Sequence, residues 1–77
     1  MFNPEGEVFI GTIRKIKRRG STRSGNPTYR LVLDNRTIDT KPDAAVNYLL
    51  GPSMEGNAYA FTLEYGQLIG FTTLNHN

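Results

Sequence analysis

The segment that most constrains the architecture is VFIGTIRKIKRR, residues 8–19. Its apolar residues Ile10, Ile13 and Ile16 are spaced by three, as they would be on one side of a helix. However, the segment is dense in β-branched residues and contains Gly11, and both features favour a strand. We therefore expect a long, bent strand whose alternation shifts at a bulge. Such a strand can contribute to both halves of a small barrel.

Four shorter strands are expected after this one. In residues 28–34 every second residue is apolar, with Tyr29, Leu31 and Leu33 on one face, which is typical of a half-buried strand. The other face holds Arg30, Val32 and Asp34. Asn35 tolerates a positive φ angle and marks a turn, and the pair Tyr65-Gly66 marks a second turn. The predicted strands cover residues 28–34, 37–40, 58–64 and 67–74.

A short helix is predicted between the third and fourth of these five strands. Thr40 and Asp43 stand in the spacing of a capping box, and Pro42 fits the first helical turn. Gly51-Pro52 is a stop signal, because the glycine can form a left-handed cap and the proline cannot continue a helix. A helix of about ten residues is unstable alone, so we expect it to pack on the sheet. Its apolar stripe would consist of Ala45, Val46, Leu49 and Leu50.

The resulting order, β-β-β-α-β-β, predicts a mainly β fold, a small five-stranded OB-like barrel. An SH3-like barrel and an open α+β sheet are the alternatives. The 77 residues allow one domain, in which residues 1–7 and 75–77 are expected to be flexible. Tyr48 is expected on the helix surface or the rim of the barrel. The aromatic side chains expected in the core are Phe9, Tyr29, Tyr59, Phe61 and Phe71.

The composition argues against most catalytic and metal-binding functions. The chain has no cysteine, and its one histidine, His76, is the penultimate residue. Ser21, Thr22 and Ser24 have no basic partner at a recognisable spacing, and the loop Gly20–Gly25 lacks the lysine of a phosphate-binding loop. We therefore expect no enzyme, no metal site and no cofactor. Without an apolar run of about 20 residues or a signal peptide, a cytoplasmic protein is expected.

The charges are distributed unevenly along the chain. The formal net charge is only +2, yet eight of the nine Lys and Arg residues precede residue 37, where they face three acids. The densest run is Arg14, Lys15, Lys17, Arg18 and Arg19. A cluster of this kind attracts polyanions, although a solvated basic surface would look the same in the sequence.

The OB-like architecture predicts where these cations meet a ligand. In that fold the loops after strands one and four flank a ligand face built from strands two and three. Here these would be the basic loop Lys17–Pro27 and the turn at Tyr65. Cations that hold phosphates and an aromatic ring that stacks on bases are how single-stranded nucleic acid is bound. Arg30 could instead pair with Asp39 across the hairpin. The predicted nucleic-acid-binding residues are Lys17, Arg18, Arg19, Arg23, Arg30 and Tyr65.

Two further motifs carry a resemblance to a known group of proteins. The chain reads SGNPTYR over residues 24–30 and TKPDAAV over residues 40–46. In this it resembles small uncharacterised proteins of actinobacterial bacteriophages. The resemblance implies a protein of the bacterial cytoplasm during infection, and it suggests an alternative function, a module that binds and modulates a host protein. A homodimer is also expected if sheet edges remain uncovered.

Overall fold

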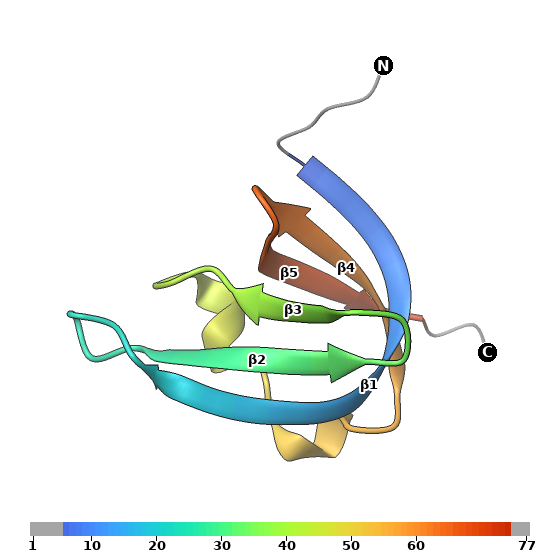
Figure 1. The fold of residues 1–77 in the computed structure, drawn as a ribbon, viewed down its shortest axis with the longest axis horizontal. Coiled ribbons are helices and arrows are strands. Elements are labelled where there is room, and N and C mark those ends of the chain that lie inside the picture. Colours follow the sequence, from blue (N-terminus) through green and yellow to red (C-terminus); the bar gives the residue numbers. More distant parts are fainter. Residues whose placement is uncertain (1–5, 75–77) are drawn as a thin grey trace.

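A computed structural model describes residues 6–74 as a small, mainly β protein (Figure 1). The strands predicted from the sequence are confirmed, with bounds that differ by a few residues at their ends. They are β1 Gly6–Ser21, β2 Pro27–Leu33, β3 Thr37–Thr40, β4 Ala58–Glu64 and β5 Gln67–Thr73, with the 3₁₀ helices η1 Ala45–Tyr48 and η2 Pro52–Met54 between β3 and β4.

The five strands close into a barrel in the order β1-β2-β3-β5-β4. β4 pairs with β1 and closes the ring, and β3 and β5 form the one parallel pair among the described residues. Because β3 lies beside β5 and not beside β4, the sheet is not a simple meander. Because β4 pairs with β1, the sheet is not open. The prediction of a mainly β, five-stranded barrel is confirmed.

β1 is the long, bent strand that the sequence predicts (Figure 1). Its first half pairs with β4 and its second half with β2, and the register shifts between Ile13 and Lys15, so that Arg14 is an extra residue. Gly11 lies at a close approach, since a Cβ atom there would be 3.1 Å from Asn35 Oδ1. Of residues 1–7, which were expected to be flexible, Gly6 and Glu7 belong to β1 and pair with β4. The rest of that segment and residues 75–77, with His76, lie outside the described residues.

The core fills the barrel with side chains from all five strands. Tyr59 and Phe61 are buried there, and Phe9, Tyr29 and Phe71 pack against the core from half-buried positions, as predicted. Ile38 of β3 is also buried, and the 3₁₀ helix η1 contributes Val46. The buried apolar residues are Ile13, Leu31, Leu33, Ile38, Val46, Met54, Tyr59, Phe61, Leu63 and Leu68.

The predicted helix over residues 40–50 is wrong, and only the single 3₁₀ turn η1 forms there. Thr40 does not cap a helix, because it belongs to β3 and its hydroxyl accepts a hydrogen bond from the Tyr29 N–H at 3.0 Å. Asp43 has a φ of 62°, which interrupts any helix at this point. Of the expected apolar stripe, Val46 is buried and Leu49 is exposed. Within residues 6–74, no helix has the length and apolar character needed to cross a membrane.

Candidate nucleic-acid interface

The outward side of β1, β2 and β3 carries cations that the strand pairing brings into register. Lys17 of β1 pairs with Arg30 of β2, and Arg30 pairs in turn with Asp39 of β3. Cross-strand partners project from the same side of a sheet, so these three side chains form a row. Lys15 projects from the same side two positions earlier, and Arg19 reaches the row through Asp39. We call these five residues the cationic face.

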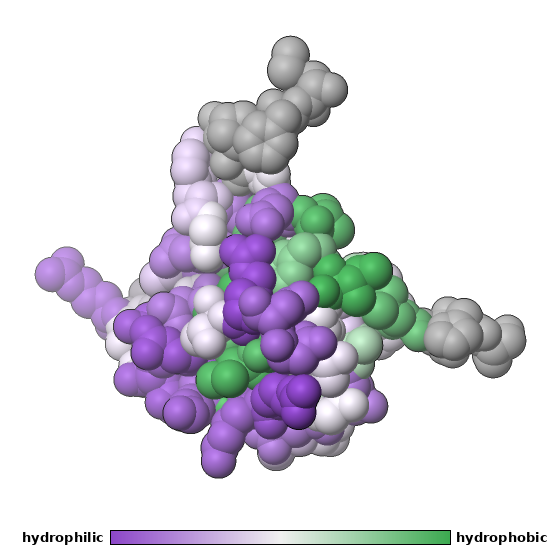
Figure 2. Space-filling model, turned by 45° about the vertical axis from the view of Figure 1, so that its right-hand side comes forward, coloured by the Kyte–Doolittle hydropathy of each residue, from purple (hydrophilic) through white to green (hydrophobic). Residues whose placement is uncertain are grey.

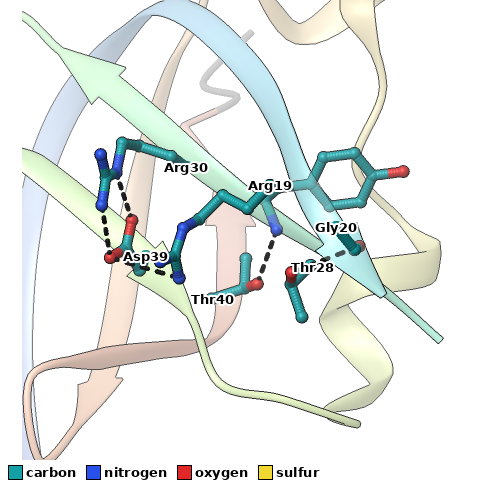
Figure 3. Close-up of polar contacts among 7 residues, drawn as sticks. Arg19, Gly20, Thr28, Arg30, Asp39 and Thr40 are labelled. Atoms are coloured by element: carbon teal, nitrogen blue, oxygen red, sulfur yellow. Dashed lines mark hydrogen bonds and ion pairs between the residues drawn. The ribbon is translucent and has the colours of Figure 1, made fainter. Parts of the chain in front are cut away.

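Asp39 is the centre of this face and contacts two arginines (Figure 3). Arg30 donates two hydrogen bonds to its carboxylate, Nε to Oδ1 at 2.8 Å and NH2 to Oδ2 at 3.2 Å. Arg19 NH1 lies 3.6 Å from Oδ2. The hydrogen bond from Arg30 lowers the pKa of Asp39, partial burial opposes this, and the charge of Arg19 lowers it further. The same hydrogen bond raises the pKa of Arg30. For Arg30, the sequence left open a phosphate contact or a pairing with Asp39 across the hairpin. The structure shows the pairing with Asp39.

The two lysines of the cationic face have no acidic partner within residues 6–74. Lys15 and Lys17 are exposed, and neither forms an ion pair with an acid in the described part of the chain. Four cations therefore stand against the single carboxylate of Asp39, which leaves the face with a formal charge of +3. This charge exceeds the net charge of the whole chain, +2, so the remaining residues together carry a formal charge of −1.

The row of charges continues toward an exposed aromatic ring. Asp39 pairs with Gln67, the first residue of β5, and Gln67 follows the turn that joins β4 to β5. Tyr65 and Gly66 form this turn with φ angles of 52° and 81°, as in a two-residue hairpin of type I′. Tyr65 is 72% exposed. With neighbouring strands about 4.8 Å apart, the row from Lys17 to Gln67 spans about 14 Å, and it ends at the residue that follows the Tyr65-Gly66 turn.

Two of the predicted site residues lie elsewhere, and the basic loop is shorter than expected. β1 continues to Ser21, which pairs with Pro27, so Lys17, Arg18 and Arg19 are strand residues and not loop residues. Arg18 pairs with Tyr29 and therefore projects from the opposite side to Lys17; its guanidinium donates to Gly20 O and Ser21 Oγ of its own strand. Arg23 is exposed at the tip of the β1–β2 hairpin. Arg19 has an acidic partner in Asp39.

The tip of the β1–β2 hairpin is fixed to the segment that precedes η1. The Asp43 carboxylate accepts hydrogen bonds from the Thr22 hydroxyl at 2.7 Å and from Asn26 Nδ2 at 2.6 Å. The bond from Asn26 and then the bond from Thr22 lower the pKa of Asp43. The Tyr48 hydroxyl donates to Asn26 Oδ1, which adds a contact from η1. These contacts hold the tip of the β1–β2 hairpin against the segment from Asp43 to Tyr48.

The site includes two residues that the sequence analysis did not select, Lys15 and Gln67. Lys15 belongs to the recognised basic run, but its direction depends on the extra residue at Arg14, which the sequence does not locate. Gln67 has no charge and enters only through the parallel pairing with β3. No group of three metal-ligating side chains is present within residues 6–74. The chemistry available on this face is the binding of an extended polyanion.

Comparisons with protein-family models, with curated proteins and with solved structures find no match to this chain. The functional interpretation therefore depends on the geometry and charge of the cationic face, together with the position of Tyr65.

Proposed function

We propose that this protein binds nucleic acid without catalysing a reaction and that the cationic face is its binding surface. The observation that carries this proposal is the cross-strand row in which Lys17 stands beside Arg30, with Lys15 and Arg19 on the same outward side. Phosphates follow one another along a nucleic acid, and Lys and Arg side chains hold them. A linear row of cations suits such a repeating anion better than a single compact one.

Tyr65 favours a single-stranded ligand over a duplex. Its ring is exposed at the end of the row, in the turn between β4 and β5. An exposed ring beside a positively charged groove or face is how proteins hold single strands, because unpaired bases can stack on it. Bases inside a duplex are already stacked on one another and cannot use the ring. We therefore expect the order of affinity to be single strand above duplex.

The proposal is tested by fluorescence anisotropy with labelled single-stranded DNA, duplex DNA and RNA. Binding to a polyanion through several cations weakens steeply between about 50 and about 200 mM salt, whereas an interface with an apolar centre weakens much less. Steep weakening therefore supports the proposal. Absence of binding even at low salt contradicts it, and the cationic face would then be examined as a docking surface for an acidic host protein.

A matched pair of variants separates the cationic face from net charge. Lys17→Gln removes a charge from the face, and Arg36→Gln removes one elsewhere, where Arg36 pairs with Glu7 at 2.8 Å and covers the Phe9 ring at 4.3 Å. One phosphate contact on a single strand contributes a slope of about 0.7 in log affinity against log salt, so its loss at about 0.1 M salt weakens binding about fivefold. We expect this loss for Lys17→Gln only. Equal effects of the two variants would mean that no particular face is used.

A further inference from the structure

The outward side of β4, of β5 and of the first half of β1 differs from the cationic face in having no charged side chain at its centre. Strand pairing places Val8 beside Thr62, Ile10 beside Ala60, and both β4 residues beside β5. The outward positions of an exposed antiparallel sheet are normally polar. We call the following residues the uncharged face: Val8, Ile10, Thr12, Ala58, Ala60, Thr62, Gly70 and Thr72.

Two β-branched side chains project from this face into solvent. Val8 is 69% exposed and Ile10 is 60% exposed, although both lie on a strand whose other side packs into the core. Figure 2 shows apolar side chains gathered on this side of the molecule, continuing toward the end of the described chain. There the exposed Leu74 borders a shallow hollow of about 300 Å³ that Ala58 also lines. Exposed apolar side chains that gather on one side of a molecule mark an interaction surface.

We infer that the uncharged face binds a second copy of this chain, giving a symmetric dimer packed sheet against sheet. A chain with a net charge of +2 repels its own copies, and this repulsion is smallest where the contact surface has no charge. The threonine hydroxyls of the face both donate and accept hydrogen bonds, so each can pair with a threonine of the other copy. A partner of opposite charge would instead be drawn to the cationic face.

The shape of the uncharged face suits contact with its own copy. In a two-fold symmetric contact, residue i of one copy meets residue j of the other and the reverse contact is also made. Here the large side chains Val8 and Ile10 lie on β1, whereas Ala60 and Gly70 leave a low area on β4 and β5. Opposed across a two-fold axis, the large residues of each copy occupy the low area of the other. Packed sheets are about 10 Å apart, which leaves room for one such interleaved layer.

The uncharged face is smaller than the interface of a stable dimer, so the dimer that it forms is weak. A specific interface buries at least about 1,000 Å² in total, or about 500 Å² from each partner. The chain exposes 5084 Å², so about a tenth of its surface from each copy is required. The uncharged face covers five residues on β1, five on β4 and three on β5, so it measures at most about 17 Å by 14 Å, or about 240 Å², before side chains at the margins are added. We therefore expect a dimer that dissociates on dilution and leaves the two cationic faces free.

The test is the mass in solution of the full chain without nucleic acid, by sedimentation equilibrium from about 10 µM to about 1 mM. We expect the mass to rise from monomer to dimer over this range and to rise as readily at high salt, since no ion pair holds the interface. The variant Ile10→Lys should remain monomeric. Its matched control is Leu49→Lys, because Leu49 is 66% exposed on η1, outside the face, and this variant should dimerise like the original chain.

Two results would overturn the inference. One is a monomer at every concentration, and the other is a dimer that Ile10→Lys does not weaken. If circular dichroism shows that Ile10→Lys is unfolded, Ile10→Thr replaces it, since threonine keeps the β-branched shape while reducing apolar surface; this variant should weaken the dimer, and unchanged association would contradict the inference. Because no nucleic acid is present, the outcome is independent of the proposed function.

Discussion

Replacing Asp39 by asparagine is expected to strengthen nucleic-acid binding. Asp39 is the one carboxylate of the cationic face. It accepts two hydrogen bonds from Arg30 and forms a 3.6 Å ion pair with Arg19. A phosphate that contacts either arginine must compete with this carboxylate. An asparagine side chain has nearly the same shape but no charge, so Asp39→Asn releases both guanidinium groups. The fold should be retained, because the ion pair lies at the exposed surface.

The magnitude follows from the number of cations released. Each additional phosphate contact on a single strand adds a slope of about 0.7 in log affinity against log salt, which is about a fivefold gain at about 0.1 M salt. One released arginine therefore gives about a fivefold gain, and two give about a 25-fold gain as an upper limit. The salt dependence should become steeper by the same number of contacts. Anisotropy titrations at three or more salt concentrations measure both quantities together.

The matched control is Glu7→Gln, which also removes one negative charge and releases one arginine. Glu7 holds Arg36 at 2.8 Å, and Arg36 lies near the turn between β2 and β3, away from the row. Any effect of overall charge is therefore the same in the two variants. If Asp39→Asn binds no more tightly than Glu7→Gln, then Arg19 and Arg30 do not contact the ligand and the cationic face is not the binding surface.

Three further predictions concern the turn at Tyr65, the buried amide side chain of Asn47 and the stability that Asp43 provides at low pH. Tyr65→Asn should weaken single-strand binding by about 1–3 kcal/mol through lost stacking, by anisotropy, while leaving stability equal or higher, by thermal melting, because Asn tolerates a φ of 52° better than Tyr. Asn47→Ala should lower the free energy of unfolding by about 1–3 kcal/mol in urea titrations, because buried Asn47 donates to Lys41 O at 2.9 Å and Ala44 O at 3.1 Å; a loss near zero would contradict this. Hydrogen bonds lower the pKa of Asp43 below its ordinary 3.8, so the stability they provide is complete above that value and is lost as the pH falls through the folded pKa. Thermal melts of Asp43→Asn should therefore decline less below about pH 4 than those of the original chain, and parallel declines would contradict the prediction.

The sequence was sufficient to predict the barrel because its strand signals are local. Residues 28–34 alternate without interruption, and in the structure Leu31 and Leu33 are buried while Arg30 is exposed. Turn chemistry at Tyr65-Gly66 likewise fixed where β4 ends and β5 begins. The prediction of a helix over residues 40–50 is wrong because its sequence signals are also local, and tertiary contacts outweigh them. Asp43 bonds to Thr22 and Asn26 in a distant hairpin, and no capping pattern reveals such a competitor.

The site was predicted in part, for a related reason. The basic run and its partner Arg30 were visible, but which cations share one side of the sheet depends on register. Arg18 and Lys17 are neighbours in sequence and project from opposite sides. The pairing of Arg19 with Asp39 brings together residues from β1 and β3, which are not adjacent in the barrel order. Contacts of this kind depend on the register of three strands, β1, β2 and β3.

The extra residue at Arg14 links both proposed surfaces to one feature of the backbone. Before it, the outward side chains of β1 are Val8 and Ile10, at even positions; after it they are Lys15 and Lys17, at odd positions. A strand without this bulge would keep one parity throughout, which would turn both lysines toward the barrel interior and Ile16 toward solvent. The spacing of three between Ile13 and Ile16 therefore does not indicate a helix, since it is what keeps both isoleucines inward across the bulge. The same shift lets a single strand present an apolar surface to a second copy and a cationic surface to a nucleic acid.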